Sequence, residues 1–190
     1  MDWTTALERL VGRPCFDRPF VCDGLPPDAT VIVVGENPAT DMGADWWSFW
    51  DPSSGFDLAA FRSEYEARRR ARNQRPVSPT RQRLDALRGS DLRTVETNAF
   101  RHEHPVGGRT GTSNHALLML LIEGMPKLRA IVAHGVPARK FLAECRSIPQ
   151  SVDLIEVGHL SRISKVEFDA LLRRLDPCRN RLRNVASAHA

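Results

Sequence analysis

Four short apolar runs recur along the chain and are separated by segments of helical periodicity. The runs cover residues 30–34, 92–97, 128–133 and 152–157. Short runs rich in β-branched residues and bounded by Gly or Asn predict strands that are buried on both faces. Strands that alternate with helices form parallel sheets with right-handed crossovers. The predicted fold class is therefore α/β, with three αβα layers: a four-stranded parallel sheet and helices on both faces.

Apolar spacing and flanking residues place helices before, between and after these strands. The predicted helices cover residues 2–11, 56–73, 79–89, 116–123, 137–144 and 164–175. Ser78 is the predicted N-cap of the third helix, and Pro79 takes its first helical position. Gly89 ends the same helix. Residues 13–28 contain four prolines, so an irregular approach to the first strand is expected. The chain is expected to form one domain, residues 1–190, with its core in about residues 30–175 and a basic tail in residues 176–190.

Polar side chains follow three of the predicted strands. Asn37 comes shortly after the first, Asn98 ends the second, and His159 comes after the fourth. The carboxyl ends of parallel strands share one edge of a sheet, and open α/β sheets bind ligands at that edge. The sequence therefore predicts one crevice lined by these three side chains. A cluster of aromatic residues, 46–50, follows Asn37 closely and could supply apolar surface to the crevice.

Charge and hydropathy narrow the possible partners and location. The net charge is +4, and Lys127, Lys140 and Lys165 are the only lysines, so arginine dominates the positive charge. Arginine suits phosphate because its planar fork donates two parallel hydrogen bonds, although arginine-rich chains can also reflect genome composition. No apolar stretch approaches ~18 residues, and the N-terminus has no long apolar centre. A cytoplasmic monomer without membrane contact is the expectation.

Cysteine and histidine spacing does not predict a metal site. The four cysteines form no CxxC pair, and a disulfide is not expected in a cytoplasmic protein. An iron–sulfur site is disfavoured by their wide spacing. His102 and His104 form an HxH pattern without a matching carboxylate or cysteine signature, so they are expected to lie in a loop. No metal and no cofactor are expected.

The motifs at the strand ends resemble those of the uracil-DNA glycosylase superfamily. The superfamily's first motif, Gly-x-Asp/Asn-Pro after a strand, is matched by residues 35–38, with Asn37 at the third place as in the mismatch-specific and single-strand-selective branches. Asn98 matches the second motif, an Asn at the end of the next strand. The third, His-Pro-Ser-Pro-Leu-Ser, is matched by residues 159–164, with Leu160 and Arg162 in place of the prolines. The resemblance covers about residues 30–175.

The resemblance implies a DNA glycosylase of base-excision repair that hydrolyses the N-glycosidic bond of a flipped uracil or a related damaged base. It implies that Asn37 orients water toward the sugar C1′ and that His159 donates a hydrogen bond to the base oxygen as negative charge collects there. The implied base-binding residues are Glu36, Phe49, Trp50 and Asn98. Of these, Phe49 or Trp50 would stack on the base and form a wall of the crevice, and Asn98 would read the base edge.

The resemblance also implies DNA contacts outside the base pocket. Ser161, Arg162 and Ser164 are the implied phosphate-binding residues of the third motif, and Ile163 is the wedge that fills the vacated base stack. The implied contacts of the second predicted helix come from Arg68, Arg69 and Arg70. This arginine-rich stretch can instead be a solvated helix face.

Each candidate residue also has a purely structural interpretation. Asn37 can form a turn before proline, Asn98 can tie its strand to the following loop, and His159 can bond a backbone carbonyl. The aromatic cluster can be partly core and partly lid. Asp41 or Asp45 could replace Asn37 as the group that activates water. The alternative function is a non-catalytic nucleic-acid or nucleobase-binding module on the same fold. A flavodoxin-like protein is disfavoured because no Gly-rich phosphate loop follows the first strand.

Overall fold

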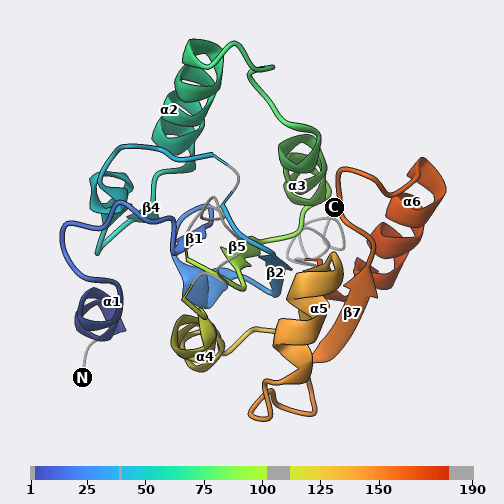
Figure 1. Cartoon of the computed structure of the whole chain (residues 1–190). Helices are drawn as coiled ribbons and strands as arrows, with labels where there is room; N and C mark the ends of the chain where they lie inside the picture. The colour runs from blue at the N-terminus through green and yellow to red at the C-terminus, as the bar shows by residue number, and fades with distance from the viewer. Residues whose placement is uncertain (1–2, 39, 102–111, 180–190) are drawn as a thin grey trace, which may run out of the picture.

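A five-stranded sheet forms the centre of the molecule (Figure 1), in a computed structural model that describes residues 3–38, 40–101 and 112–179. In spatial order the strands are β1 (Phe20–Val21), β5 (Thr94–Asn98), β2 (Val31–Gly35), β6 (Ala130–His134) and β7 (Asp153–Val157). The last four strands are parallel to one another, as the sequence predicts, and β1 runs antiparallel to β5. The fold is a three-layer α/β fold.

Alternate residues of the central strand face the two helical layers. Ile32 and Val34 of β2 pack in a core with α1 (Trp3–Val11), α4 (His115–Gly124) and α5 (Val136–Ala143). Val31 and Val33 face the other way, into a core with α3 (Pro79–Gly89) and α6 (Lys165–Arg174). A strand covered on both faces is apolar at every position, which is why the sequence pattern of this strand is a continuous run.

The prediction of four strands is wrong by one, because β1 forms inside the proline-rich segment. Phe20 and Val21 pair with Thr97 and Glu96 of β5. Two residues are too few for an alternating pattern, and Pro19 just before them signals irregular chain. The antiparallel β1 covers the edge of β5 that would otherwise carry unpaired backbone groups.

The segment between β2 and α2 (Leu58–Ala71) is more ordered than the predicted loop. It contains the 3-10 helix η2 (Trp46–Phe49) and a small hairpin of β3 (Trp50–Asp51) and β4 (Gly55–Phe56). Asp57 then caps α2, since its carboxylate accepts a hydrogen bond from the Ala60 amide at 2.9 Å. The predicted start of this helix at residue 56 was therefore early by two residues, because Phe56 belongs to the hairpin.

Two absences bear on the predicted partners. None of the helices within residues 3–38, 40–101 and 112–179 has both the length and the apolar character needed to cross a membrane. In the same residues, no group of three or more His, Cys, Asp or Glu side chains is arranged to hold a metal ion. His102 and His104 and the tail from residue 180 onward lie outside the described residues.

A buried ion cluster joins α3 to β5. The Glu96 carboxylate lies 2.7 Å from Nη1 of Arg81 and 2.6 Å from Nη1 of Arg88, and all three side chains are nearly inaccessible to solvent. Burial alone would raise the pKa of Glu96, but Arg81 and Arg88 together lower it, so the carboxyl is ionised at neutral pH. The cluster holds α3 against the sheet.

We expect Glu96→Gln to destabilise the fold strongly, because Arg81 and Arg88 would keep only the more distant Asp85 carboxylate, at 4.0 and 3.6 Å, as an opposite charge. Removing one partner of a buried ion pair costs about 3–5 kcal/mol. Chemical denaturation measures the loss. Glu66→Gln is the matched control: Glu66 pairs with Arg70 on the surface of α2 at 2.7 Å, and such pairs contribute at most about 1 kcal/mol. Equal losses in the two variants would contradict this account of the cluster.

Candidate active site

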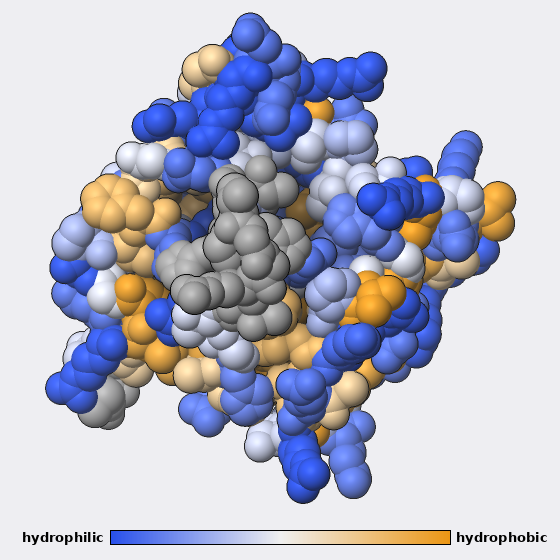
Figure 2. All heavy atoms as spheres, in the orientation of Figure 1, coloured by the Kyte–Doolittle hydropathy of each residue, from blue (hydrophilic) through white to orange (hydrophobic). Residues whose placement is uncertain are grey.

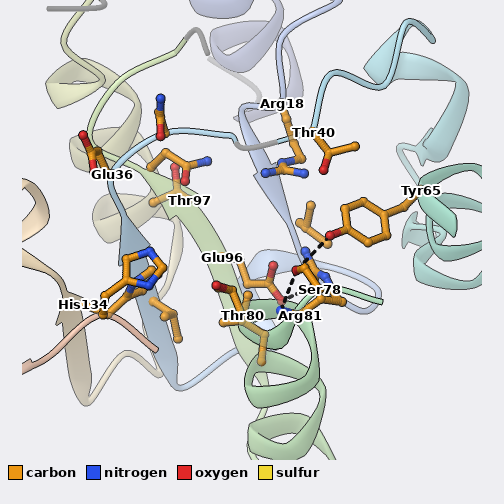
Figure 3. Close-up of a pocket in the computed structure, with 16 residues that line it drawn as sticks. Arg18, Glu36, Thr40, Tyr65, Ser78, Thr80, Arg81, Glu96, Thr97 and His134 are labelled. Carbon is orange, nitrogen blue, oxygen red and sulfur yellow. Dashed lines mark hydrogen bonds and ion pairs between the residues drawn. The ribbon is translucent and has the colours of Figure 1, made fainter. Parts of the chain in front are cut away.

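A polar cavity lies at the carboxyl ends of β2, β5 and β6. Its volume is about 170 Å³, below the roughly 300–1,000 Å³ of pockets for drug-sized ligands, so it suits a single ring better than a whole nucleotide. Figure 3 shows Glu36 and His134 on one side and Tyr65, Thr40 and Arg18 on the other. The first side comes from the strand ends and the second from α2 and from the segments around β1 and β2.

Asn37, Asn98 and His159 all line this cavity, although they are far apart in the sequence. The parallel register explains their meeting, since Gly35 at the end of β2 lies opposite Asn98 at the end of β5. His159 follows β7, whose last residue, Val157, pairs with His134 of β6. The structure thus brings these three residues to one edge of the sheet, as the sequence predicts. Their chemical roles stay a prediction.

Gly35 lets two polar side chains approach the end of β2. A Cβ atom at this position would stand 2.9 Å from Nε2 of His134 and 3.0 Å from Oδ1 of Asn98. These are closer than side-chain carbons normally come to other atoms, so even an alanine would push the two groups away. The glycine of the first motif therefore has a steric reason here: it leaves room for an amide and an imidazole above the strand.

His159 is a neutral imidazole whose tautomer is fixed by its neighbour. The Ser161 amide donates to its Nδ1 at 3.3 Å, and the Ser161 hydroxyl lies 2.7 Å from the same nitrogen. An Nδ1 that accepts a backbone hydrogen bond leaves the proton of neutral His159 on Nε2. Partial burial and the nearby charge of Arg162 lower the pKa of His159, while Glu36 opposes the shift.

His134 is the cavity residue whose role the sequence did not reveal. It is the last residue of β6 and only 6% exposed, and its ring packs edge-on against His159 with centroids 5.1 Å apart. Burial, and secondarily His159, lowers its pKa to about 4. One signal was available: like Asn98, His134 is a polar residue that ends a predicted strand at the carboxyl edge.

The prediction that Phe49 or Trp50 forms a wall of the cavity is wrong. Phe49 and Trp50 are 8% and 9% exposed and belong to the core on the α1 side of the sheet. The Trp50 ring packs against Trp46 at 5.5 Å and against Phe20 at 5.8 Å. Their distance from Gly35 along the sequence matched the superfamily motif, but the hairpin turns both rings inward. Among the described residues that line the cavity, Tyr65 is the one Phe, Tyr or Trp side chain.

The third motif is divided between surface and core. Ser161 and Arg162 are exposed, as contacts with DNA require. Ile163 is only 7% exposed and packs in the α3–α6 core, so it is not the exposed wedge that the sequence predicted. Ser164 is the N-cap of α6: its hydroxyl accepts from the Glu167 amide at 3.2 Å, and the Glu167 carboxylate accepts from its amide at 2.7 Å. This capping box gives Ser164 a structural role that the motif alone did not indicate.

The surface over α2 is strongly hydrophilic (Figure 2), and the last turn of this helix carries Arg68, Arg69 and Arg70. Arg68 and Arg70 pair with Glu64 and Glu66 one helical turn earlier, at 2.6 and 2.7 Å. Arg69 instead donates to the Arg75 carbonyl at 2.6 Å, and its guanidinium lies 5.7 Å from the centre of the Tyr65 ring. The two acids lower the positive charge of this face, so the three arginines are not equivalent candidates for phosphate contacts.

Comparisons with known proteins give one similar structure. No family model matches this sequence, and no curated protein matches it either. Among solved structures, it is similar to a solution NMR structure of a putative uracil DNA glycosylase from Methanosarcina acetivorans. The sequence identity is 18%, the TM-score is 0.41, and the match covers 84% of this chain and 96% of that chain.

We expect acid to destabilise the protein partly through His134. The unfolded chain protonates this histidine near its ordinary pKa of 6.5, whereas the folded protein does so only at about pH 4. Stability is therefore lost as pH falls below 6.5, by about 2 kcal/mol between pH 7 and pH 5 from this group. Thermal melts of wild type and His134→Gln across this range should show a shallower fall for the variant. Parallel curves would contradict the assignment.

Proposed function

We propose that the protein is a DNA glycosylase of the uracil-DNA glycosylase superfamily, acting on uracil or a related damaged base. The observation that carries the proposal is the single-ring cavity that Asn37, Asn98 and His159 line together. An amide at the end of β2, an amide at the end of β5 and a neutral imidazole after β7 supply the groups that base recognition and departure require. No step of this reaction draws on a metal ion or an organic cofactor.

The reaction divides the work between these side chains. The bond between C1′ and the base nitrogen breaks with its electron pair leaving on the base. A water molecule oriented by the Asn37 amide adds its oxygen to C1′ and gives up a proton to solvent. The Nε2–H of His159 donates to a carbonyl oxygen of the departing base, where negative charge develops. The base is held by Asn98, whose amide can both donate and accept at a base edge.

A second function is favoured by one specific observation, the burial of Ile163. An enzyme that flips a base from a duplex commonly inserts an apolar side chain into the gap. With Ile163 in the core, the same cavity could bind a nucleobase that is already unpaired, without catalysis. A non-catalytic nucleobase-binding module therefore remains the alternative, and an excision assay on single-stranded and duplex substrates separates the two.

We expect wild type to release uracil from an oligonucleotide, detected as strand cleavage after alkali treatment. His159→Ala should slow the single-turnover rate by about a hundredfold with little change in DNA affinity, because its hydrogen bond strengthens only as the base becomes anionic.

Asn98→Asp should shift the base preference toward cytosine, since a carboxylate only accepts hydrogen bonds and repels the uracil O4. Asn73→Asp, the same change at an exposed residue after α2, is the matched control. If wild type cleaves none of the lesion-bearing oligonucleotides, the glycosylase proposal fails and the non-catalytic binding module is the function that stands.

We also expect DNA affinity to fall with salt, because arginine contacts release counterions from phosphate. The slope of log affinity against log salt should fall by about 0.9 for each phosphate contact that is removed on duplex DNA. The triple variant of Arg68, Arg69 and Arg70 to Ala should lose one such contact or more, and Arg146→Ala, at an exposed position after α5, should lose none. Fluorescence anisotropy measures both slopes. Identical slopes would assign the face of α2 to solvent.

A further inference from the structure

A second pocket adjoins the cavity, and we call it the outer pocket. Its volume is about 250 Å³, against about 170 Å³ for the cavity, and Arg18 and Thr40 line both spaces. Figure 3 shows these two residues at the end of the cavity away from His134. Phe16 and Met42 supply apolar surface to the outer pocket. Two linked ligand groups can therefore occupy the cavity and the outer pocket at the same time.

Phe16 presents an aromatic ring to solvent at this pocket. It is 61% exposed, whereas every other Phe, Tyr or Trp within the described residues is buried or half-buried. A single exposed apolar residue is ordinary on a protein surface. Phe16 differs because it lines a pocket that opens beside the candidate active site. A flat ring in that position is a platform on which another ring can stack.

The short loop that carries Phe16 is anchored at both ends. The Cys15 carbonyl accepts a hydrogen bond from the Trp46 amide at 2.7 Å. At the other end, the Pro19 carbonyl accepts from the Thr97 hydroxyl at 2.8 Å. An anchored loop has little conformational freedom left to lose when a ligand binds to it. The exposed ring therefore belongs to a pre-organised surface.

Positive charge is in excess around the outer pocket. Four guanidinium groups line it or contact its wall: those of Arg18, Arg69, Arg72 and Arg101. Nη1 of Arg69 lies 3.4 Å from the Thr40 hydroxyl, and Nη2 of Arg72 lies 3.3 Å from the Asp41 carboxylate. The described lining contains two carboxylates, those of Asp17 and Asp41. An aromatic ring within a cationic rim suits a nucleotide, which joins a flat base to an anionic phosphate.

We propose that the outer pocket binds the nucleotide next to the one whose base enters the cavity, with the neighbouring base stacked on Phe16. This deepens the proposed function, on which it rests, by naming the substrate class: an unpaired strand. A base that enters a pocket turns its edges toward the protein, so it cannot stay paired with a second strand. The burial of Ile163 agrees, because an unpaired strand has no duplex stack for an inserted side chain to fill. Stacking reads no base edge, so the identity of the neighbouring base should matter little.

The first experiment measures stacking without relying on catalysis. The probe is a single-stranded oligonucleotide with one deoxyuridine that carries fluorine at the sugar 2′ carbon, which disfavours positive charge at C1′ and so slows bond cleavage. Two further probes lack the base of the 5′ or of the 3′ neighbour. We expect Phe16→Ala to weaken binding of the intact probe by about fivefold to a hundredfold, the range for one stacked base, and Phe16→Trp to keep the wild-type affinity. On one of the two further probes, wild type and Phe16→Ala should bind equally, because the stacked base is already absent.

Val166→Ala is the matched control, since Val166 is 74% exposed but does not line the outer pocket. This variant should bind every probe as wild type does. If Phe16→Ala binds the intact probe as tightly as wild type, or loses the same factor on all three probes, the inference is overturned. If Phe16→Ala changes the oligomeric state in sedimentation but not the DNA affinity, the outer pocket is an interface between copies of the chain and the inference also fails. Circular dichroism of each variant confirms that folded proteins are compared.

The second experiment compares strand states and separates this inference from the proposed reaction. Annealing the complementary strand to the intact probe should weaken wild-type binding at least as much as Phe16→Ala does, because pairing withdraws the neighbouring base from the ring. A duplex that binds as tightly as the single strand would overturn the inference. If wild type excises no base but Phe16→Ala loses affinity only when the neighbouring base is present, the glycosylase proposal fails and the outer pocket stands as a nucleotide site. If wild type excises uracil and Phe16→Ala keeps its single-strand affinity, the glycosylase proposal stands and the nucleotide site fails.

Discussion

The in-register parallel pairing of β2 with β5 and β6 is the constraint on which the rest of the structure depends. Gly35 pairs with Asn98, and β6 brings His134 to the other side of the same strand end. A slip of one residue would turn every side chain of a strand to the opposite face. Such a slip would exchange the apolar residues of both cores and remove Asn98 from the cavity. The stability of the cores and the geometry of the site therefore share one origin.

The buried charges of Glu96, Arg81 and Arg88 close the cavity on the side that the strand ends leave open. Arg81 stands at the beginning of α3 and reaches Glu96 on β5, while its guanidinium also lies 5.5 Å from the centre of the Tyr65 ring. Tyr65 in turn donates from its hydroxyl to Ser78, the N-cap of α3, at 3.0 Å. One ion cluster thus positions α3 against the sheet and α2 against α3. Arg81 and Arg88 thus have a structural role that the positive charge of the sequence alone does not indicate.

The sequence predicted what depends on local pattern and missed what depends on packing. Continuous apolar runs located the four parallel strands, and the polar residues after them located the shared edge. The inward turn of Phe49 and Trp50 depends on the hairpin of β3 and β4, whose strands are two residues long and leave no periodic pattern. Ile163 matched the position of a wedge, but burial is decided by the helices that surround it and not by motif spacing.

His134 shows that local sequence pattern is equally insufficient at the candidate site. A histidine at the end of an apolar strand can equally be a satisfied core residue or a ligand-binding group, and only the positions of its neighbours distinguish the two. A Cβ at Gly35 would crowd both the His134 imidazole and the Asn98 amide, so this glycine allows the two groups to lie at the same strand end. The motif contains this glycine, but its steric role depends on the side chains of the adjacent strands.

In the proposed reaction, a neutral His159 suits the departure of a base better than a charged one would. Partial burial and the charge of Arg162 disfavour a protonated His159, although the Glu36 carboxylate opposes them. A neutral donor binds the uncharged base only moderately, and its hydrogen bond strengthens as the electron pair of the broken bond moves onto the base. In the proposed reaction, the burial that lowers the pKa of His159 therefore also reserves much of its interaction for the transition state. The small volume of the cavity strengthens this effect, since it leaves little room for water to screen the developing charge.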